Sequence, residues 1–309
     1  MNDKGYSIKD ACQYFEKTSQ GYYYCINSQK EKELFRMEVI SHVHNIRKDM
    51  PRLGGRKLHY KLNSEGIKIG RDRLFRILRE ENLLIKRKRK YTMTTDSEHH
   101  YKVYDNLIKD KEITGAEEVF VSDITYLHTE EGFYYLSIVG DAYTKKILGK
   151  YVSDDLKAIS TLKAFIEALH NKRYKKPGIH HSDRGVQYCS KSYTDAIKLS
   201  NMVISMSEKG KAYDNPVAER MIGILKDEYG LNEKFKTKTL AYKAVEQAIH
   251  SYNTQRPHLS CGYLTPDEAH IKGENLINMW KRKTYSHIHK KKEKKQKKEK
   301  LLQLHYTLN

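Results

Sequence analysis

The stretch "EVFVSDITYLHTEEGFYYLSIVGDAYTKKILGKYVS", residues 118–153, decides which fold we expect for this chain. It contains three segments rich in β-branched and aromatic residues, "EVFVSDITYLHT", "FYYLSIVGDAYT" and "KKILGKYVS". Glu130, Glu131 and Gly132 separate the first two segments and are typical of a hairpin turn. The stretch therefore predicts three consecutive antiparallel strands.

After residue 153 the pattern changes to alternating helices and strands. Apolar residues recur at helical spacing in residues 156–171, and "PGIHHSD" (177–183) predicts a fourth strand. A helix, a fifth strand and two further helices are predicted over residues 190–201, 201–207, 216–230 and 240–253. This succession implies an α/β fold, in which a mixed five-stranded sheet carries helices on both faces.

Residues 1–110 predict a separate, all-helical region. The run "IKDACQYFEKTSQGYYYCI" (8–26) has a Thr-Ser break between two helical segments, and residues 33–49 repeat apolar side chains at the helical period. The repeated side chains are Leu34, Met37, Ile40 and Val43. Two short helices follow, around residues 56–65 and 71–82, and the glycines of "EGIKIG" suit the tight connection between them. This order indicates a helix-turn-helix-like region that binds DNA.

The charge of the chain supports a polyanionic partner. Its 309 residues include 58 Lys and Arg against 39 Asp and Glu, a formal net charge of +19. Such a surface attracts nucleic acid. Residues 274–309 predict a basic tail, for which a solubilising segment and nonspecific DNA binding both remain open.

Within the helical region, the basic residues of the second short helix and of the run "KRKRK" (86–90) are candidates for phosphate contacts. A solvated helix face is the alternative interpretation. The candidates are Arg71, Arg73, Arg76, Lys86, Arg87, Lys88 and Arg89.

Nothing in the sequence suggests a membrane protein. No run of 18 apolar residues occurs, and residues 1–15 lack the apolar segment of a signal peptide. The four cysteines form no Cys-x-x-Cys pair. We therefore expect a cytoplasmic protein without a membrane partner.

Three carboxylates are candidates for a metal site. Asp123 lies inside an apolar strand, where a charge is costly unless it has a partner such as a cation. Asp183 ends the fourth strand, which a right-handed crossover can place beside the first. Glu219 flanks the apolar face of its helix, and Lys226 follows seven residues later on the same face.

Three converging carboxylates would repel one another unless cations neutralise them. Mg²⁺ prefers oxygen ligands and accepts phosphate oxygens in the rest of its shell, and Mn²⁺ is a possible substitute. Two such ions can hold the attacking and leaving oxygens of a phosphoryl displacement. Other carboxylates compete on composition alone, namely Asp141, Asp154, Asp155 and Asp214. Asp141 is the most serious rival, whereas Asp214 is better explained as a helix cap.

The motifs around these residues resemble the DDE-type transposases of bacterial insertion sequences, which are related to retroviral integrases. The matching motifs are "DITY" at Asp123, "HSDRGVQY" at Asp183 and "AYDNPVAERMIGILKDE" at Glu219, with 219 − 183 = 36 as the characteristic spacing. Farther on, "YNTQRPHLSCGYLTP" (252–266) resembles the C-terminal signature of that family. The resemblance covers roughly residues 8–270.

The resemblance implies a ribonuclease-H-like, integrase-type catalytic core over residues 111–273. It implies that Asp123, Asp183 and Glu219 are the catalytic metal ligands and that Lys226 contacts DNA. The implied activity is Mg²⁺-dependent DNA cleavage and strand transfer, acting on the inverted-repeat ends of a mobile element and on target DNA. A homo-oligomer on DNA, a possible fusion with the product of an upstream reading frame, and a bacterial, nucleoid-associated location are also implied.

Two other functions remain open. A ribonuclease-H-like nuclease would cleave without joining, and a catalytically inactive DNA-binding regulator would keep only the helical region and the fold. The regulator gives no reason for Asp123, Asp183, Glu219 and Lys226 to occur together, and a test for strand joining separates the nuclease from the transposase.

Overall fold

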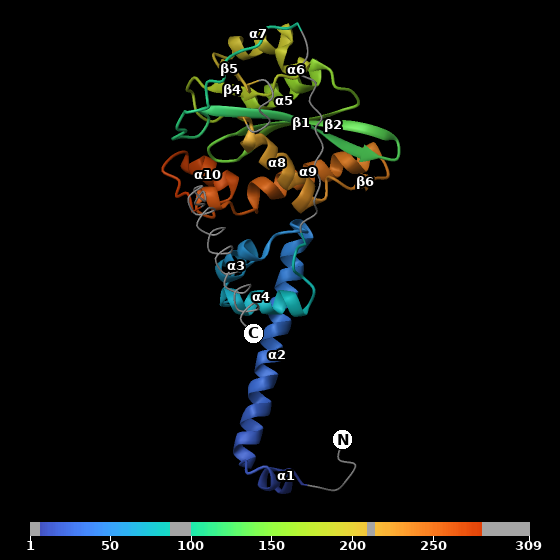
Figure 1. Cartoon of the computed structure of the whole chain (residues 1–309), viewed down its shortest axis with the longest axis vertical. Coiled ribbons are helices and arrows are strands. Elements are labelled where there is room, and N and C mark those ends of the chain that lie inside the picture. The colour runs from blue at the N-terminus through green and yellow to red at the C-terminus, as the bar shows by residue number, and fades with distance from the viewer. Residues whose placement is uncertain (1–6, 87–99, 209–213, 280–309) are drawn as a thin grey trace, which may run out of the picture.

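The structure is a computed structural model, and it describes residues 7–86, 100–208 and 214–279. Four helices come first: α1 (Ile8–Tyr14), α2 (Ser19–Asp49), α3 (Gly55–Ser64) and α4 (Arg71–Glu80). A sheet with its own helices follows (Figure 1). No helix in the described parts of the chain is long and apolar enough to cross a membrane.

The helical region confirms the predicted helices, but α2 is one helix where two segments were expected. It begins after Thr18, whose hydroxyl accepts a hydrogen bond from the Gly21 N–H at 3.0 Å, so the predicted break lies at this cap. From there α2 continues without interruption to Asp49.

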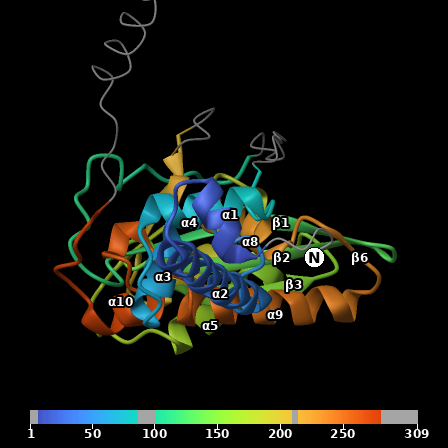
Figure 2. The same ribbon diagram turned by 90° about the horizontal axis from the view of Figure 1, so that it is seen from below.

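The predicted apolar face of α2 is only partly buried. Leu34 and Met37 are 67% and 60% exposed, whereas Val39, Val43 and Ile46 are buried. The reason is that α3 and α4 pack beside the C-terminal half of α2 only, while α1 and the first half of α2 extend away from the body (Figures 1 and 2). Helical spacing alone could not indicate where the covering helices end.

A mixed sheet forms the centre of the second region. Its main path is ordered β3-β2-β1-β4-β5, with the first three strands antiparallel and β4 and β5 parallel to β1. The strands are β1 (Val119–Thr129), β2 (Gly132–Asp141), β3 (Ile147–Ser153), β4 (Ile179–Ser182) and β5 (Val203–Met206). A sixth strand, β6 (Lys234–Phe235), pairs with the end of β1. The five predicted strands are confirmed, and β6 was missed because two residues carry no periodic pattern.

Helices cover both faces of this sheet, as expected. On one face lie α5 (Ala158–His170), α6 (Val186–Cys189) and α7 (Lys191–Leu199), and on the other lie α8 (Pro216–Tyr229), α9 (Lys238–Thr254) and α10 (Pro266–Lys272) (Figure 1). A short 3₁₀ turn, η2 (Leu259–Cys261), connects α9 with α10. The second face points toward the helical region, so α8 and α9 lie between the sheet and α2–α4 (Figure 1).

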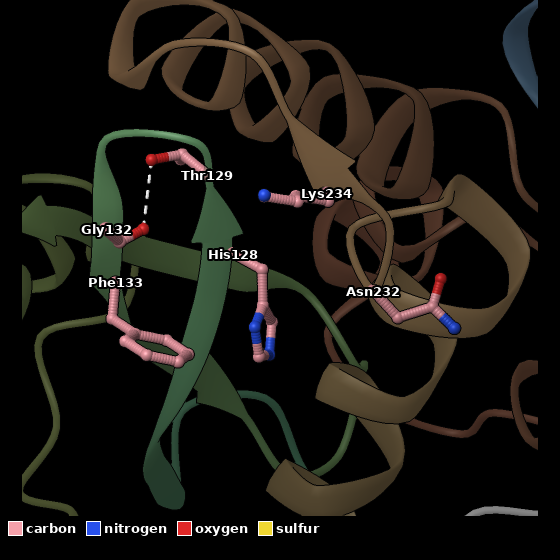
Figure 3. A pocket seen from close by; sticks show the side chains of 6 residues that line it. All are labelled: His128, Thr129, Gly132, Phe133, Asn232 and Lys234. Atoms are coloured by element: carbon pink, nitrogen blue, oxygen red, sulfur yellow. Dashed lines mark hydrogen bonds between the residues drawn. The ribbon is translucent and has the colours of Figure 1, made fainter.

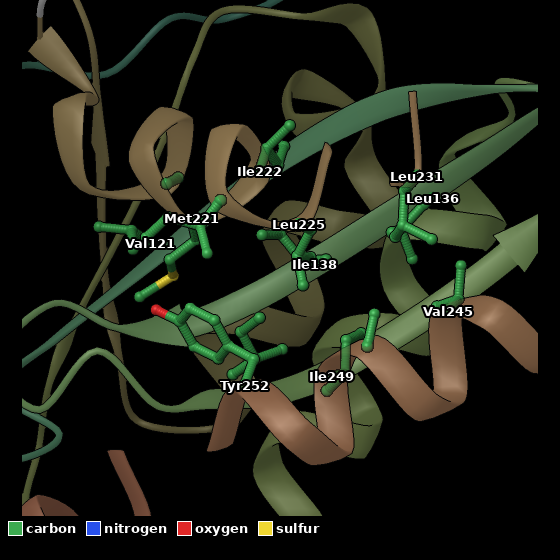
Figure 4. Packing of buried hydrophobic residues seen from close by; sticks show 14 of the residues in the cluster. Val121, Leu136, Ile138, Met221, Ile222, Leu225, Leu231, Val245, Ile249 and Tyr252 are labelled. Atoms are coloured by element: carbon green, nitrogen blue, oxygen red, sulfur yellow. The ribbon is translucent and has the colours of Figure 1, made fainter. Parts of the chain in front are cut away.

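Close packing sets the position of α8 on the sheet. Met221, Ile222 and Leu225 of α8 pack on Val121 and Ile138 of the central strands (Figure 4). A Cβ atom at Gly140 of β2 would lie 2.6 Å from the Met221 sulfur, so a larger residue there would displace the Met221 side chain. The apolar face predicted for this helix is therefore confirmed.

The chain before β1 already contacts the sheet. The Met206 N–H donates to the Asp105 carbonyl at 3.2 Å, and the Leu107 N–H donates to the Ser205 hydroxyl at 2.9 Å. The division of the chain at residues 110 and 273 stays a prediction.

Candidate active site

Strand pairing places Asp123 and Asp183 next to each other. In the parallel β1–β4 ladder, Val121 lies opposite His181, and the two aspartates each follow two residues later. β4 pairs with β1 only as far as Val121, and β6 pairs with β1 from His128. In the described chain, the edge of β1 between these two points is therefore free of a neighbouring strand, and the aspartates lie at its start.

The electrostatics of Asp123 show which charged groups surround it. Burial, followed by the charge of Asp183, raises its pKa to about 8. The Ile124 N–H donates to Asp123 Oδ1 at 2.8 Å and opposes this rise. Glu219 raises the pKa further, whereas Lys226 lowers it. The four residues singled out in the sequence thus act on one another electrostatically at one place in the fold.

Asn215 fixes the start of α8 against β1. Its side-chain Nδ2 donates to the Ser122 carbonyl at 2.9 Å, beside Asp123 in the chain. Pro216 then opens α8 in its first turn, where a missing N–H costs nothing. Sequence reasoning missed Asn215 as a positioning residue, although it stands inside the motif around Glu219.

Glu219 is near the two aspartates but does not complete a ligand set with them. Its side chain is exposed, and partial burial raises its pKa. Among the described residues, no three His, Cys, Asp or Glu side chains are grouped closely enough to hold a metal ion. Asp183 acts on the charge of Asp123 more strongly than Glu219 does, and the role of the three carboxylates as metal ligands stays a prediction.

The donor atoms of this site fit a hard divalent cation. All three candidate ligands are carboxylates, and oxygen is the ligand that Mg²⁺ and Mn²⁺ accept most readily. The raised pKa of Asp123 means that its charged form is poorly compensated by the protein alone. A bound cation is the kind of partner that would compensate it.

Two buried histidines hold β4 in place. His180 Nε2 lies 2.8 Å from the Ser122 hydroxyl and 2.9 Å from the Tyr193 hydroxyl. His181 Nδ1 lies 2.8 Å from the Ser205 hydroxyl of β5. Burial lowers the pKa of His180 to about 3 and that of His181 to about 4, so both rings are neutral at pH 7. They connect the strand that presents Asp183 with its neighbours on either side.

The rival carboxylates have other partners. Asp141 is buried and accepts hydrogen bonds from the N–H groups of Glu117, Tyr143 and Thr144 and from the Thr144 hydroxyl, so it stabilises the turn after β2. Asp154 pairs with Lys238, and Asp155 with Lys157.

The interpretation of Asp214 as a helix cap was wrong. The residue at the cap of α8 is Asn215. Asp214 instead accepts hydrogen bonds from the Glu208 N–H at 2.8 Å and from Asn106 Nδ2 at 3.1 Å. It therefore fastens the segment before β1 to the chain that follows β5.

The candidate DNA contacts of α4 lie on its exposed side. Arg71 pairs with Asp72 at 2.8 Å, and the Arg73 guanidinium lies 4.5 Å from the centre of the Phe35 ring. Arg76 and Lys86 are exposed. The remaining candidates, Arg87, Lys88 and Arg89, lie outside the described residues. The role of all these residues in DNA binding stays a prediction.

A pocket of about 410 Å³ lies at the far end of β1, away from the carboxylates (Figure 3). Its walls come from the β1–β2 turn and from the chain around β6, and its lining residues are His128, Thr129, Gly132, Phe133, Asn232 and Lys234. None of the predicted site residues lines it.

Comparison with known proteins identifies the family. Two family models, each described as an integrase core domain, match residues 114–212 and 200–266. The chain is 35% identical to the insertion element IS600 31 kDa protein of Shigella sonnei, over 82% of this chain and 95% of that protein. It is 30% identical to the transposase InsF of insertion sequence IS3A from Escherichia coli, over 85% and 93% of the two chains.

The chain is less similar to solved structures than to these relatives. The HTLV-2 integrase catalytic core domain in complex with magnesium is 17% identical, with a TM-score of 0.40, over 50% of this chain and 96% of that chain. The mixed sheet with helices on both faces, within the residues matched by the integrase models, is the expected ribonuclease-H-like fold. With a relative 30% identical over nearly the whole of both chains, this chain belongs to the InsF-type family of insertion-sequence transposases with an integrase core.

Proposed function

We propose that this protein is a DDE-type transposase that cuts DNA at the ends of a mobile element and joins the freed 3′ ends to target DNA. One observation carries the proposal. Asp123 and Asp183 lie side by side at an open edge of β1, with Glu219 and Lys226 reaching the same place from α8. A regulator without catalysis would have no use for this costly group of charges.

Each residue has a separate role in the proposal. Asp123 and Asp183 would hold the divalent cation, with Glu219 as the third carboxylate ligand. Mg²⁺ or Mn²⁺, when bound, supplies charge that stabilises the pentavalent phosphate and lowers the pKa of the attacking water or 3′-hydroxyl. Lys226 acts on the charge of Asp123, which supports a role in binding a phosphate of the DNA strand beside the carboxylates.

The helical region supplies DNA binding in this proposal. Arg71, Arg73 and Arg76 lie on α4, and their phosphate contacts give an affinity that falls steeply with salt. Because two element ends have to be cut and joined together, at least two copies of the chain assemble on DNA. The product of an upstream reading frame is a candidate fusion partner.

The test is strand joining. Labelled duplexes that carry the terminal inverted repeats flanking the gene are incubated with Mg²⁺ or Mn²⁺ and a target plasmid, with wild type beside Asp183→Asn. We expect the wild type to cut and join, and the variant to bind DNA without doing either. Cutting without joining would instead indicate a nuclease. Binding without either reaction, both alone and as a fusion with the upstream product, would indicate a regulator.

A further inference from the structure

The signature "YNTQRPHLSCGYLTP", residues 252–266, has no part in the site described so far, yet much of it is buried. The Tyr252 hydroxyl donates to the Lys145 carbonyl at 2.9 Å. The Asn253 side chain binds both backbone groups of Ile147, at 2.8 and 3.0 Å. These contacts hold the turn that joins β2 and β3. The middle of the signature has a different partner.

Arg256 is 2% exposed and binds the C-terminal end of α8. Its Nε and Nη2 donate to the two carboxylate oxygens of Glu228, at 2.9 and 2.8 Å. Its Nη1 lies 2.8 Å from His258 Nε2, and burial together with the Arg256 charge keeps the pKa of His258 low, so this ring accepts the bond. A two-pronged bond of this kind fixes both the position and the orientation of the carboxylate.

Glu228 also binds the helical region. Lys57 of α3 lies 3.3 Å from the same carboxylate, and the Arg52 N–H donates to the Glu228 carbonyl at 3.1 Å. Nearby, the ring of Tyr60 on α3 stacks on Tyr263 of the signature, 4.5 Å apart and at 10°. We name the cluster of Lys57, Glu228 and Arg256 the junction.

Within the junction, it is the Lys57 contact that is poorly explained as a source of stability. Although burial opposes the charge of Glu228, hydrogen bonding and charge from Arg256, followed by Lys57, lower the pKa of Glu228 to about 2 and so favour its charged form. Burial, followed by the charge of Arg256, lowers the pKa of Lys57 to about 8, so its charged form is unfavourable in the folded protein. An apolar side chain of similar length would be tolerated at least as well. By contrast, two regions joined by a small polar interface move relative to each other unless specific contacts prevent it. The charged Lys57 at this interface is therefore suited to hold the two regions in a fixed orientation.

The junction and the carboxylate site are at opposite ends of one helix. Glu219 and Glu228 are nine residues apart on α8, about 14 Å at 1.5 Å per residue. Asn215 fixes the start of α8 to β1, beside Asp123, and the junction binds the other end of α8. The helix therefore connects the carboxylates with the helical region. The distance between DNA bound by the helical region and the carboxylates depends on this connection through α8.

We propose that the junction sets the position at which DNA is cut, by holding the helical region at a fixed distance and angle from the carboxylates. Lys57, Glu228 and Arg256 are thus positioning residues. The inference rests on the proposed function, because it assumes that the helical region binds the element end and that the core cuts it.

The variant that tests the junction is Lys57→Met, which removes the side-chain ion pair between Glu228 and the helical region. It keeps the bond from the Arg52 N–H to the Glu228 carbonyl and leaves the pair of Arg256 and Glu228 intact. The control is Lys150→Met, which breaks the ion pairs of β3 with Glu167 of α5 and Glu246 of α9 and none of the contacts of the junction. Two measurements are made on the full chain: the cut position on the labelled end duplex, and the distance between spin labels at Ser41→Cys and Leu240→Cys. Cys25, the exposed cysteine, is replaced by serine for labelling.

We expect the wild type and Lys150→Met to cut at one principal phosphate and to give one narrow distance. Lys57→Met should still bind the duplex with unchanged affinity, broaden the distance distribution, and spread the cuts over neighbouring phosphates. A shift of one position or more is expected, since phosphates of one strand are about 3.4 Å apart along the axis. A purely stabilising role would lower the yield of folded protein but leave the cut position unchanged.

Either of two results overturns the inference: a distance distribution that stays narrow in Lys57→Met, or a broadened one with an unchanged cut position. If Lys57→Met does not fold, Tyr60→Ala replaces it, because Tyr60 is 39% exposed and its loss removes only the stacking on Tyr263. If the wild type never cuts DNA, the proposed function fails by itself. The distance measurement then decides whether the junction fixes the two regions.

Discussion

Replacing Asp123 by asparagine should stabilise the metal-free protein at alkaline pH. The folded structure raises the pKa of Asp123 from 3.8 to about 8, through burial first and the charge of Asp183 second. A group whose pKa is raised on folding contributes stability that is complete below its unfolded pKa and is lost as the pH rises through the folded value. The wild type therefore loses stability between pH 4 and pH 8, and Asp123→Asn does not.

The size of the effect follows from the same shift. At about 1.4 kcal/mol per pKa unit, a difference of about four units sets an upper limit of about 6 kcal/mol. Asp123 is only partly buried, and water around it reduces this figure, so we expect a gain of about 2 kcal/mol for the variant at pH 8.5. At pH 5 most of the gain should be absent.

Urea unfolding in the presence of a chelator measures this difference, with the free energy of unfolding compared at pH 5 and pH 8.5. Asp141→Asn is the matched control, because Asp141 is buried with its hydrogen bonds satisfied and its loss should destabilise the protein at both pH values. Adding Mn²⁺ at pH 8.5 should stabilise the wild type and have little effect on Asp123→Asn. A variant less stable than the wild type at pH 8.5 without metal would refute the reasoning that the carboxylates repel each other.

Three further predictions concern the fold and the DNA contacts. Gly149→Ala should destabilise the protein by about 3 kcal/mol in thermal or urea unfolding, because a Cβ there would lie 2.6 Å from a backbone nitrogen of α5. Gly223→Ala inside α8, with open space around it, should not destabilise the protein. Arg76→Ala should leave the unfolding transition unchanged and reduce the salt dependence of DNA binding by about one ion, measured by fluorescence anisotropy; an unchanged slope would remove Arg76 from the interface. Asn215→Ala should cost about 1–2 kcal/mol and lower the cutting rate more than the DNA affinity, because it frees the start of α8 from β1; equal losses in both would contradict this role.

Much of the fold could be predicted from local pattern. β1, β2 and β3 are long enough for their β-branched and aromatic residues to identify them as strands. The crossover rule placed β4 beside β1. α10 was missed although its signal is present, since Thr265 and Glu268 form a capping box with Pro266 in the first turn. The junction could not be predicted, because Glu228 and Arg256 are 28 residues apart and no local pattern relates the charges of distant segments.

The motifs of the sequence proposed the members of the candidate site, and their role as metal ligands stays a prediction. The motifs selected Asp123, Asp183 and Glu219, and the electrostatics of Asp123 bring all three together. No sequence pattern could show that the described side chains form no close group of three metal ligands, because that depends on side-chain positions and not on residue type. The position of α8 matters equally, and it is set by contacts at both ends that are remote in sequence.

These two contacts limit how Glu219 can reach the aspartates. Asn215 binds β1 at the start of α8, and Glu228 is held by Arg256 and Lys57 at its end. Sliding the helix would break both contacts and also the close packing of Met221 against Gly140. Rotating the exposed Glu219 side chain breaks none of them and costs less than about 2 kcal/mol of rotamer freedom. If Glu219 completes the proposed ligand set, rotation of its side chain would therefore be the less costly route, and it would leave the geometry between the helical region and the carboxylates unchanged.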